Sequence, residues 1–194
     1  MISAHGLRAQ NADQFSMAVV TGTMGAGVGA NSEIFQFRWT STSTLCIVKK
    51  VLVSAGNVAT AFTAGLTKMD LMFARAWTAA GTGGGTATIT TNNAKLKTSF
   101  ATTGVGEIRV ATTAALGAGT KTLDAQALDA ICHSVAAVEG TPVIPRTTLW
   151  DASKEDEYRL ILAAEDGLVV RASVPATGSW TGAVAIRWLE IKPY

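Results

Sequence analysis

The sequence is poor in charge, cysteine and histidine, and each shortage excludes a class of protein. Charged residues make up 15% of the 194 residues, against about 25% in an average soluble domain. The net charge is only +2, and the longest basic run is the pair at 49–50. Nucleic-acid binding normally needs a basic face, so we expect no nucleic-acid partner.

The low charge is compensated by hydrophobic and small residues. Hydrophobic residues account for 48% of the chain, and 19 glycines occur together with many Ala, Thr and Ser residues. This composition predicts a folded chain, and its length suits one domain with or without an arm. A surface so poor in charge is either covered by a partner or simply neutral, and composition leaves both readings open.

Two cysteines, Cys46 and Cys132, are too few for a disulfide framework or a zinc site. Both have apolar neighbours in the sequence, which predicts buried free thiols, although a single bridge between them stays open. The two histidines, His5 and His133, would have to supply any histidine-based triad. We expect His133 to be a core or interface side chain.

No motif of a catalytic or cofactor site is present. The chain has no G-x-S-x-G sequence and no Gly-Lys pair, and the glycines at 25, 27 and 29 miss the dinucleotide spacing. The acidic run at 151–157 lacks the alternating ligands and central glycine of a calcium loop. We therefore expect no enzyme, no catalytic residue, no metal ligand and no cofactor; a hydrolase with distant carboxylates is the weakest alternative.

The N-terminal region is polar and has no apolar core of a signal peptide. The uncharged run at 14–32 contains four glycines and makes a poor membrane helix. We expect no membrane partner and synthesis in the cytoplasm. Because the run "TGTMGAGVGANS" is too rich in glycine for a regular element, residues 1–32 are predicted to be an extended arm before a domain at 33–194.

Strand patterns dominate the rest of the chain. The segment 33–39 places Phe35, Phe37 and Trp39 on one face, and 45–55 is rich in β-branched residues and stops at Gly56-Asn57. The segment 66–77 alternates so that one face carries Met69, Leu71, Phe73, Arg75 and Trp77.

The segment 123–138 is ambiguous. Leu128, Ile131 and Val135 have helical spacing, and local propensity slightly favours a helix, but the same residues also fit the alternation of a strand.

The C-terminal third contains three strand candidates separated by "EDG" and "PATGS". We predict that 169–174 and 180–188 pair as a hairpin through Pro175–Ser179, with Trp180 buried. The five tryptophans occupy alternating strand positions and are expected in the core rather than on a sugar-binding platform. Eight or nine short strands with almost no helix predict an all-β antiparallel sandwich, jelly-roll-like, although strand counting does not separate it from an immunoglobulin-like sandwich.

The segment "EDGLVVRASVPATGSWTGAVAIRWLEI" resembles the end of a group of tailed-phage virion structural proteins, and "SEIFQFRWTSTSTLCIVKKVLV" and "NNAKLKTSFAT" are similar to that group as well. The resemblance extends over about 31–191. It implies a β-sandwich or jelly-roll protein on the exterior of a phage capsid, favours a strand at 128–135 and offers no catalytic residue.

These observations together predict a structural virion protein that decorates or cements a capsid without catalysis. Its expected partners are the major capsid protein and further copies of itself, most simply in a homotrimer bound at a threefold position of the lattice. In that setting the arm would be ordered only on the particle. The alternative is a tail or fibre module that binds a receptor or carbohydrate.

Overall fold

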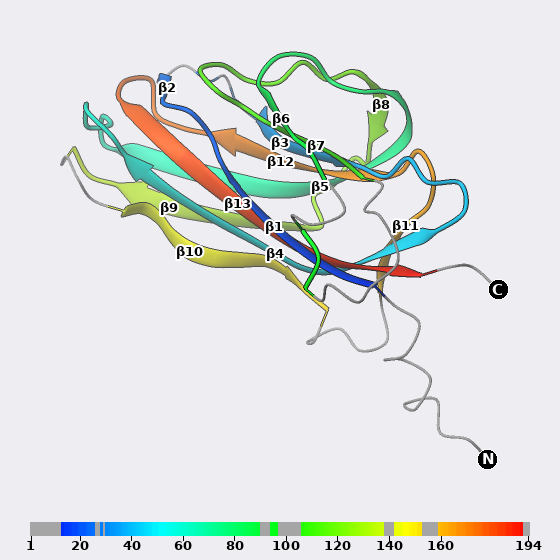
Figure 1. Ribbon diagram of the computed structural model, residues 1–194. Helices are drawn as coiled ribbons and strands as arrows, with labels where there is room; N and C mark the ends of the chain where they lie inside the picture. The colour runs from blue at the N-terminus through cyan, green and yellow to red at the C-terminus, as the bar shows by residue number, and fades with distance from the viewer. Residues whose placement is uncertain are drawn as a thin grey trace.

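The computed structural model describes residues 13–25, 28, 30–89, 94–96, 106–137, 142–152 and 159–191. Within these ranges the chain forms strands and no helix. The strands make two antiparallel sheets that pack face to face (Figure 1). The all-β sandwich predicted from the sequence is thereby confirmed.

One sheet, sheet A, is built around two long strands. These are β4 (Leu45–Asn57) and β13 (Ser179–Ile191), which pair along their whole length. Two outer strands pair with β13, namely β1 (Asp13–Val20) and β2 (Met24–Gly25). Two others pair with β4, namely β10 (Pro142–Asp151) and β11 (Leu160–Leu162).

The second sheet, sheet B, has β12 (Gly167–Ser173) at its centre between β3 (Ser32–Arg38) and β5 (Gly65–Ala79). Short strands extend it on both sides. They are β6 (Gly85–Ala87), β7 (Glu107–Val110), β8 (Thr120–Leu123) and β9 (Asp129–Val135).

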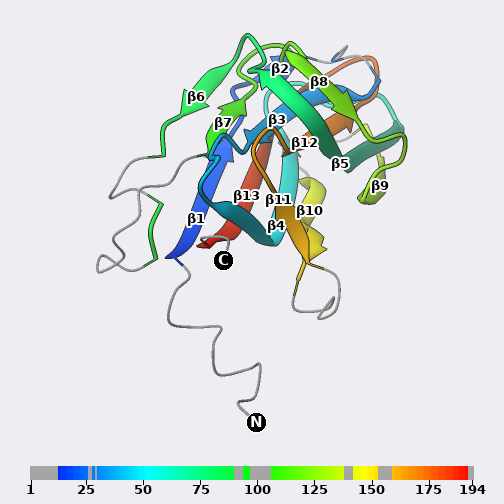
Figure 2. The ribbon, with the colours of Figure 1, turned by 90° about the vertical axis from the view of Figure 1, so that its right-hand side faces the viewer.

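The strand pairs are nested along the chain. β1 pairs with β13, β3 with β12, β4 with β10 and β5 with β9. Each pair thus encloses the next one in sequence, and the first and third pairs lie in sheet A whereas the second and fourth lie in sheet B. The view in Figure 2 shows the two layers that this alternation produces.

The core lies between the sheets and is rich in aromatic side chains. Because strand residues alternate between faces, β13 directs Trp180, Val184, Ile186 and Trp188 inward, and all four are buried. The ring of Phe15 stacks on Trp188 with 5.2 Å between centroids. The expectation that tryptophans belong to the core is confirmed for Trp39, Trp77, Trp180 and Trp188, and Trp150 is half-buried.

The predicted arm at 1–32 is wrong for residues 13–25, which belong to sheet A. Every residue of β1 is in register with β13, and the amide of Thr21 donates to the carbonyl of Gly182 at 2.8 Å. The side chains of Phe15 and Met24 are fully buried. Phe15, Met17 and Val19 alternate as a strand requires, but the glycines at 22–29 favoured an irregular arm in the sequence. Residues 1–12 of the predicted arm lie outside the described residues.

The predicted C-terminal hairpin is also wrong. β12 lies in sheet B and β13 in sheet A, so the two strands never pair. Both edges of each strand are already occupied: β12 lies between β3 and β5, and β13 between β1 and β4. The connection through Pro175 and Gly178, whose φ is 114°, crosses from one sheet to the other.

The structure decides two further sequence patterns: the helix-or-strand alternative at 123–138 has the strand that the resemblance favoured, and the predicted placement of Trp77 is wrong. Residues 129–135 form strand β9, because pairing with β5 outweighs the slight helical propensity of that segment. Trp77 lies on the face opposite to Met69, Leu71 and Phe73. The cause is an irregularity at Ala76, whose φ of 49° interrupts the strict alternation of β5.

The position of β1 in the sheet leads to a stability prediction. Replacing Phe15 by Ala should lower the free energy of unfolding by about 3–5 kcal/mol, because it leaves a cavity beside Trp188. Urea denaturation measures this change. Gln14→Ala, at the exposed neighbouring position, is the control and should change stability by less than about 0.5 kcal/mol. Equal, small effects of both substitutions would support the arm that was first predicted.

Candidate interaction surface

The outer face of sheet B is covered by the chain itself. The segment 111–128, which includes β8, lies over it in Figure 1. Backbone hydrogen bonds fix this segment, from Leu116 to the carbonyl of Glu33 and from Leu128 to the carbonyl of Leu71. A second apolar cluster lies beneath it, formed by Met72, Ala74, Trp77 and Val169 with Leu123 and Ala127 against them.

A buried acid lies in the centre of sheet B and is held by two cations. The carboxylate of Asp70 accepts two hydrogen bonds from the guanidinium of Arg171, at 2.8 and 2.9 Å, and lies 2.8 Å from the ammonium of Lys68. Burial alone would raise the pKa of Asp70, but the hydrogen bonds from Arg171 and Lys68 outweigh burial and lower the pKa below its ordinary value.

A lysine fastens the covering segment to sheet B. The ammonium of Lys121 lies 2.9 Å from the carboxylate of Glu33 and 4.6 Å from the centroid of the Trp77 ring. It also donates to the carbonyl of Ala118. Only 1% of the Lys121 side chain is exposed. The buried charge of Lys121 is thus compensated by the Glu33 carboxylate and by the Trp77 ring, as burial requires. This group of residues presents no reactive side chain to solvent.

The outer face of sheet A has a different character. Its residues alternate with the buried core positions of β13 and β4 and are mostly small or uncharged. In register across β1, β13 and β4 they form the rows Val20–Ala183–Ser54 and Ala18–Ala185–Leu52. Ala18 and Val20 are exposed. None of the described segments crosses this face as 111–128 crosses the other.

One end of the sheet A face is hollowed. A depression of about 550 Å³ has a floor of small residues, including Gly56, Thr181 and Ala183, and is bounded by Val20 on one side and by Pro145 and Arg146 on the other. Irregular pairing of β10 with β4 raises the second wall, since the register shifts on both sides of Ile144. The volume lies within the range of about 300–1,000 Å³ of ligand or side-chain pockets.

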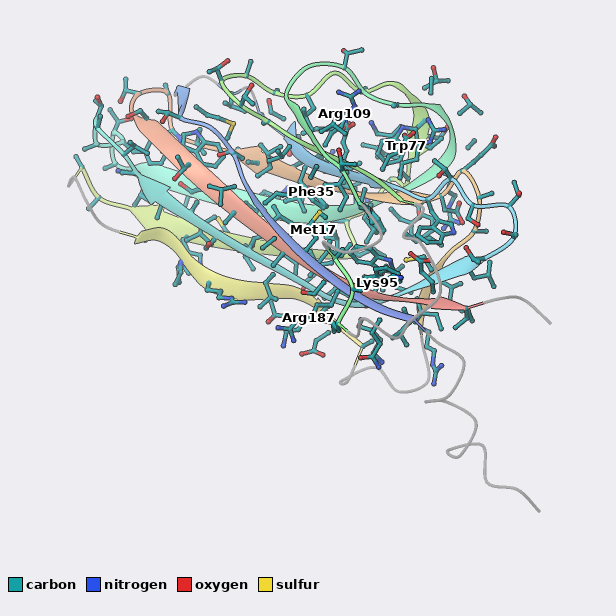
Figure 3. The ribbon with its side chains drawn as sticks, viewed as in Figure 1. Met17, Phe35, Trp77, Lys95, Arg109 and Arg187 are labelled. Carbon is teal, nitrogen blue, oxygen red and sulfur yellow. The ribbon has the colours of Figure 1, made fainter. Side chains whose placement is uncertain are left out.

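Charge on sheet A is sparse and mostly positive. Lys50 pairs with Asp151 at 2.9 Å, and Arg187 is directly opposite Lys50 in the register of β13 and β4. Among the described residues, Arg146 and Arg187 have no acidic partner and both are exposed. Figure 3 shows Arg187 on the outer side of sheet A and Arg109 on the opposite side of the molecule, with Met17 and Phe35 between the sheets.

The residues considered from the sequence do not meet in a reactive site. His133 is half-buried on β9. Cys46 is buried as predicted, but Cys132 is exposed because it lies on the outward side of that edge strand, and neither is in a disulfide. In the described ranges no three His, Cys, Asp or Glu side chains are placed to hold a metal ion, and no helix could span a membrane. The acidic run at 151–157 lies mostly outside the described residues, and so does His5.

The sheet A face was not recognised in the sequence. Its residues are spread over β1, β4, β10 and β13, and no local motif connects them. The signal that could have indicated it was the run of small residues at the outward positions of 181–185. No protein-family model matches the chain, and no curated protein matches it.

The two cysteines should differ sharply in reactivity. Burial, and then the nearby charge of Glu190, raises the pKa of the Cys46 thiol well above its usual value, so this thiol stays protonated and inaccessible. We expect a disulfide reagent to titrate one thiol in the native protein and two after unfolding. Cys132→Ser should abolish the native reaction. Rapid native reaction of that variant would contradict the burial of Cys46.

Asp70 should make stability depend on pH below about pH 4, its ordinary pKa region. Because the folded pKa is lowered, the unfolded chain binds this proton more readily, so stability is present above that region and is lost as pH falls through the folded pKa. Asp70→Asn should therefore flatten the acid limb of a plot of unfolding free energy against pH. Parallel curves for the two proteins would contradict this role.

Proposed function

We propose that this protein is a structural component of a tailed-phage virion that decorates or cements the capsid and performs no catalysis. The proposal rests on one observation above all, the bare outer face of sheet A. The chain covers one face of its sandwich with its own segment 111–128, whereas none of the described segments covers the other face, whose side chains are mostly small and uncharged. Such a face is typical of a surface that a further protein covers.

Several other features support this reading. The described residues contain no metal cluster, and their perturbed ionisable groups are paired or buried inside the sandwich. Among the described residues, the rings of Phe15, Phe35, Phe37, Trp39, Trp77, Trp180 and Trp188 lie in the core, and Trp150 is half-buried. The resemblance of the C-terminal sequence to phage virion proteins supplies the biological setting, a capsid exterior reached after synthesis in the host cytoplasm.

The jelly-roll form of the sandwich is part of the proposal. The nested pairs β1–β13, β3–β12, β4–β10 and β5–β9 support it, because rolling one long antiparallel hairpin produces this order. Such a rolled sheet is common among capsid and lectin domains. We propose the major capsid protein and further copies of this chain, most simply in a homotrimer, as its partners, and no nucleic acid or membrane.

Binding to capsids tests the function directly. Purified protein should sediment with empty capsids of the phage whose genome encodes it, with a saturating copy number in the hundreds per particle. Bovine serum albumin at equal concentration controls for trapping in the pellet. Absence from the capsid, together with binding to a host glycan or with a few copies on the tail, would replace this function with the receptor-binding alternative.

A further inference from the structure

Eleven of the described charged residues form ion pairs within the protein, and others, of both signs, have no ion pair among the described residues. Ion pairs join Arg38 to Glu107, Lys50 to Asp151, Lys68 and Arg171 to Asp70, Arg75 to Asp124 and Lys121 to Glu33. Two of the unpaired cations lie on sheet A, Arg187 on its outer face and Arg146 at the wall of the hollow. Glu165 is left in the turn between β11 and β12, with no ion pair among the described residues. These two ends of the sandwich are opposite each other in Figure 1.

Glu165 is held in a conformation that a glutamate rarely adopts. Its φ is 67°, in the left-handed region that favours Gly or Asn. It is the third residue of a turn closed by a 3.0 Å hydrogen bond from the amide of Asp166 to the carbonyl of Ala163, the turn position at which Gly is preferred. A strained residue that is exposed and unpaired indicates a role outside the folding of the monomer.

The turn that carries Glu165 is rigidly attached to the body of the sandwich. The amide of Glu165 donates to the carbonyl of Trp39 at 3.0 Å, and the carbonyl of Glu165 accepts from the amide of Trp77 at 2.7 Å. Both tryptophan side chains are buried. The turn between β11 and β12 is therefore fixed at the end of the sandwich that faces the viewer in Figure 2, and docking it requires little ordering of the chain.

The hollow on sheet A is shaped to receive a narrow tip. A side chain added at Gly56 would meet no atom within 4 Å, so this part of the floor is open. Thr181 is opposite Gly56 in the register, and Ala183 is opposite Ser54. The floor is thus made of small residues, with Arg146 at the rim as a cation that could pair with an entering carboxylate.

The charges on sheet A argue against docking of two identical faces. Arg187 and Lys50 are direct neighbours on this face, and Asp151 is already paired with Lys50. Stacking the same face of a second copy on it would bring cations together without new acids, which is unfavourable. A surface that complements sheet A carries acid without an ion pair. The described acids of this kind include Asp129 on β9 and Glu165 and Asp166 in the turn between β11 and β12, and of these three Glu165 has the strained backbone.

We propose that the turn at 163–166 of one copy enters the hollow of the next copy, where the Glu165 carboxylate pairs with the Arg146 guanidinium. This inference rests on the self-assembly that is part of the proposed function. The two patches lie on different parts of the chain, so the contact is head-to-tail. Such a contact gives a ring when the rotation between copies closes and an open filament when it does not, and the proposed homotrimer requires the ring.

Charge exchange between the two residues tests the contact. Sedimentation velocity of the full chain over a range of concentrations should show a wild-type oligomer. Arg146→Glu and Glu165→Arg should each weaken association by about thirtyfold or more, and the double variant should restore it. Gly56→Leu, which fills the floor of the hollow, should weaken association with both charges intact. Arg109→Glu, on the opposite side of the molecule, is the matched control and should leave the oligomer unchanged.

A second measurement separates assembly from folding. Glu165→Gly relieves the left-handed backbone, so its thermal unfolding midpoint, compared with that of wild type under conditions where both are monomeric, should rise while its association weakens. A wild-type protein that stays monomeric at all concentrations, an oligomer indifferent to Arg146→Glu, or a double variant that stays dissociated would each overturn the contact. Capsid binding is measured separately, so a monomer that still saturates capsids would refute this contact and leave the proposed function standing.

Discussion

The nested pairing of strands is the constraint on which the rest of the structure depends. Once β1 pairs with β13 and β3 with β12, the two halves of the sequence are joined strand by strand, and successive strands such as β12 and β13 must lie in different sheets. The inward faces of both sheets then meet over one aromatic core, where Phe15 and Phe37 contact Trp188 from opposite sheets. Local hairpin formation has little part in this arrangement.

The same constraint makes the two outer faces unequal. The long connection at 111–128 returns over sheet B and is held there by Lys121 and Glu33, which buries a second apolar cluster beneath it. Sheet A receives no such cover from the described residues. Its small side chains and its hollow beside Arg146 give it the form of a docking face, and the unpaired Glu165 at the other end offers a matching charge. We therefore propose that the outer face of sheet A, which the described segments leave exposed in the monomer, becomes buried when the protein assembles.

The sequence predicted the fold class and most strands because period-two alternation is a local signal, as at β3, β4 and β5. It failed where partners distant in sequence decide the outcome. The turn residues at 175–179 favoured a hairpin, yet the partners of β13 are β1 and β4. Phe15, Met17 and Val19 alternated as a strand requires, but adjacent glycines obscured them. The hollow at Gly56 and the strained backbone at Glu165 are properties of three-dimensional pairing and turn geometry, which no local pattern encodes.

The central claim, that sheet A carries the assembly surface, is tested most directly by hydroxyl-radical footprinting of the protein in dilute and in concentrated solution. Val20 at the hollow and Leu66 on sheet B are matched probes, with 63% and 66% of their surfaces exposed. The account predicts that oxidation of Val20 slows several-fold when the protein assembles, whereas oxidation of Leu66 does not change. Protection of Leu66 with Val20 still fully reactive would contradict it.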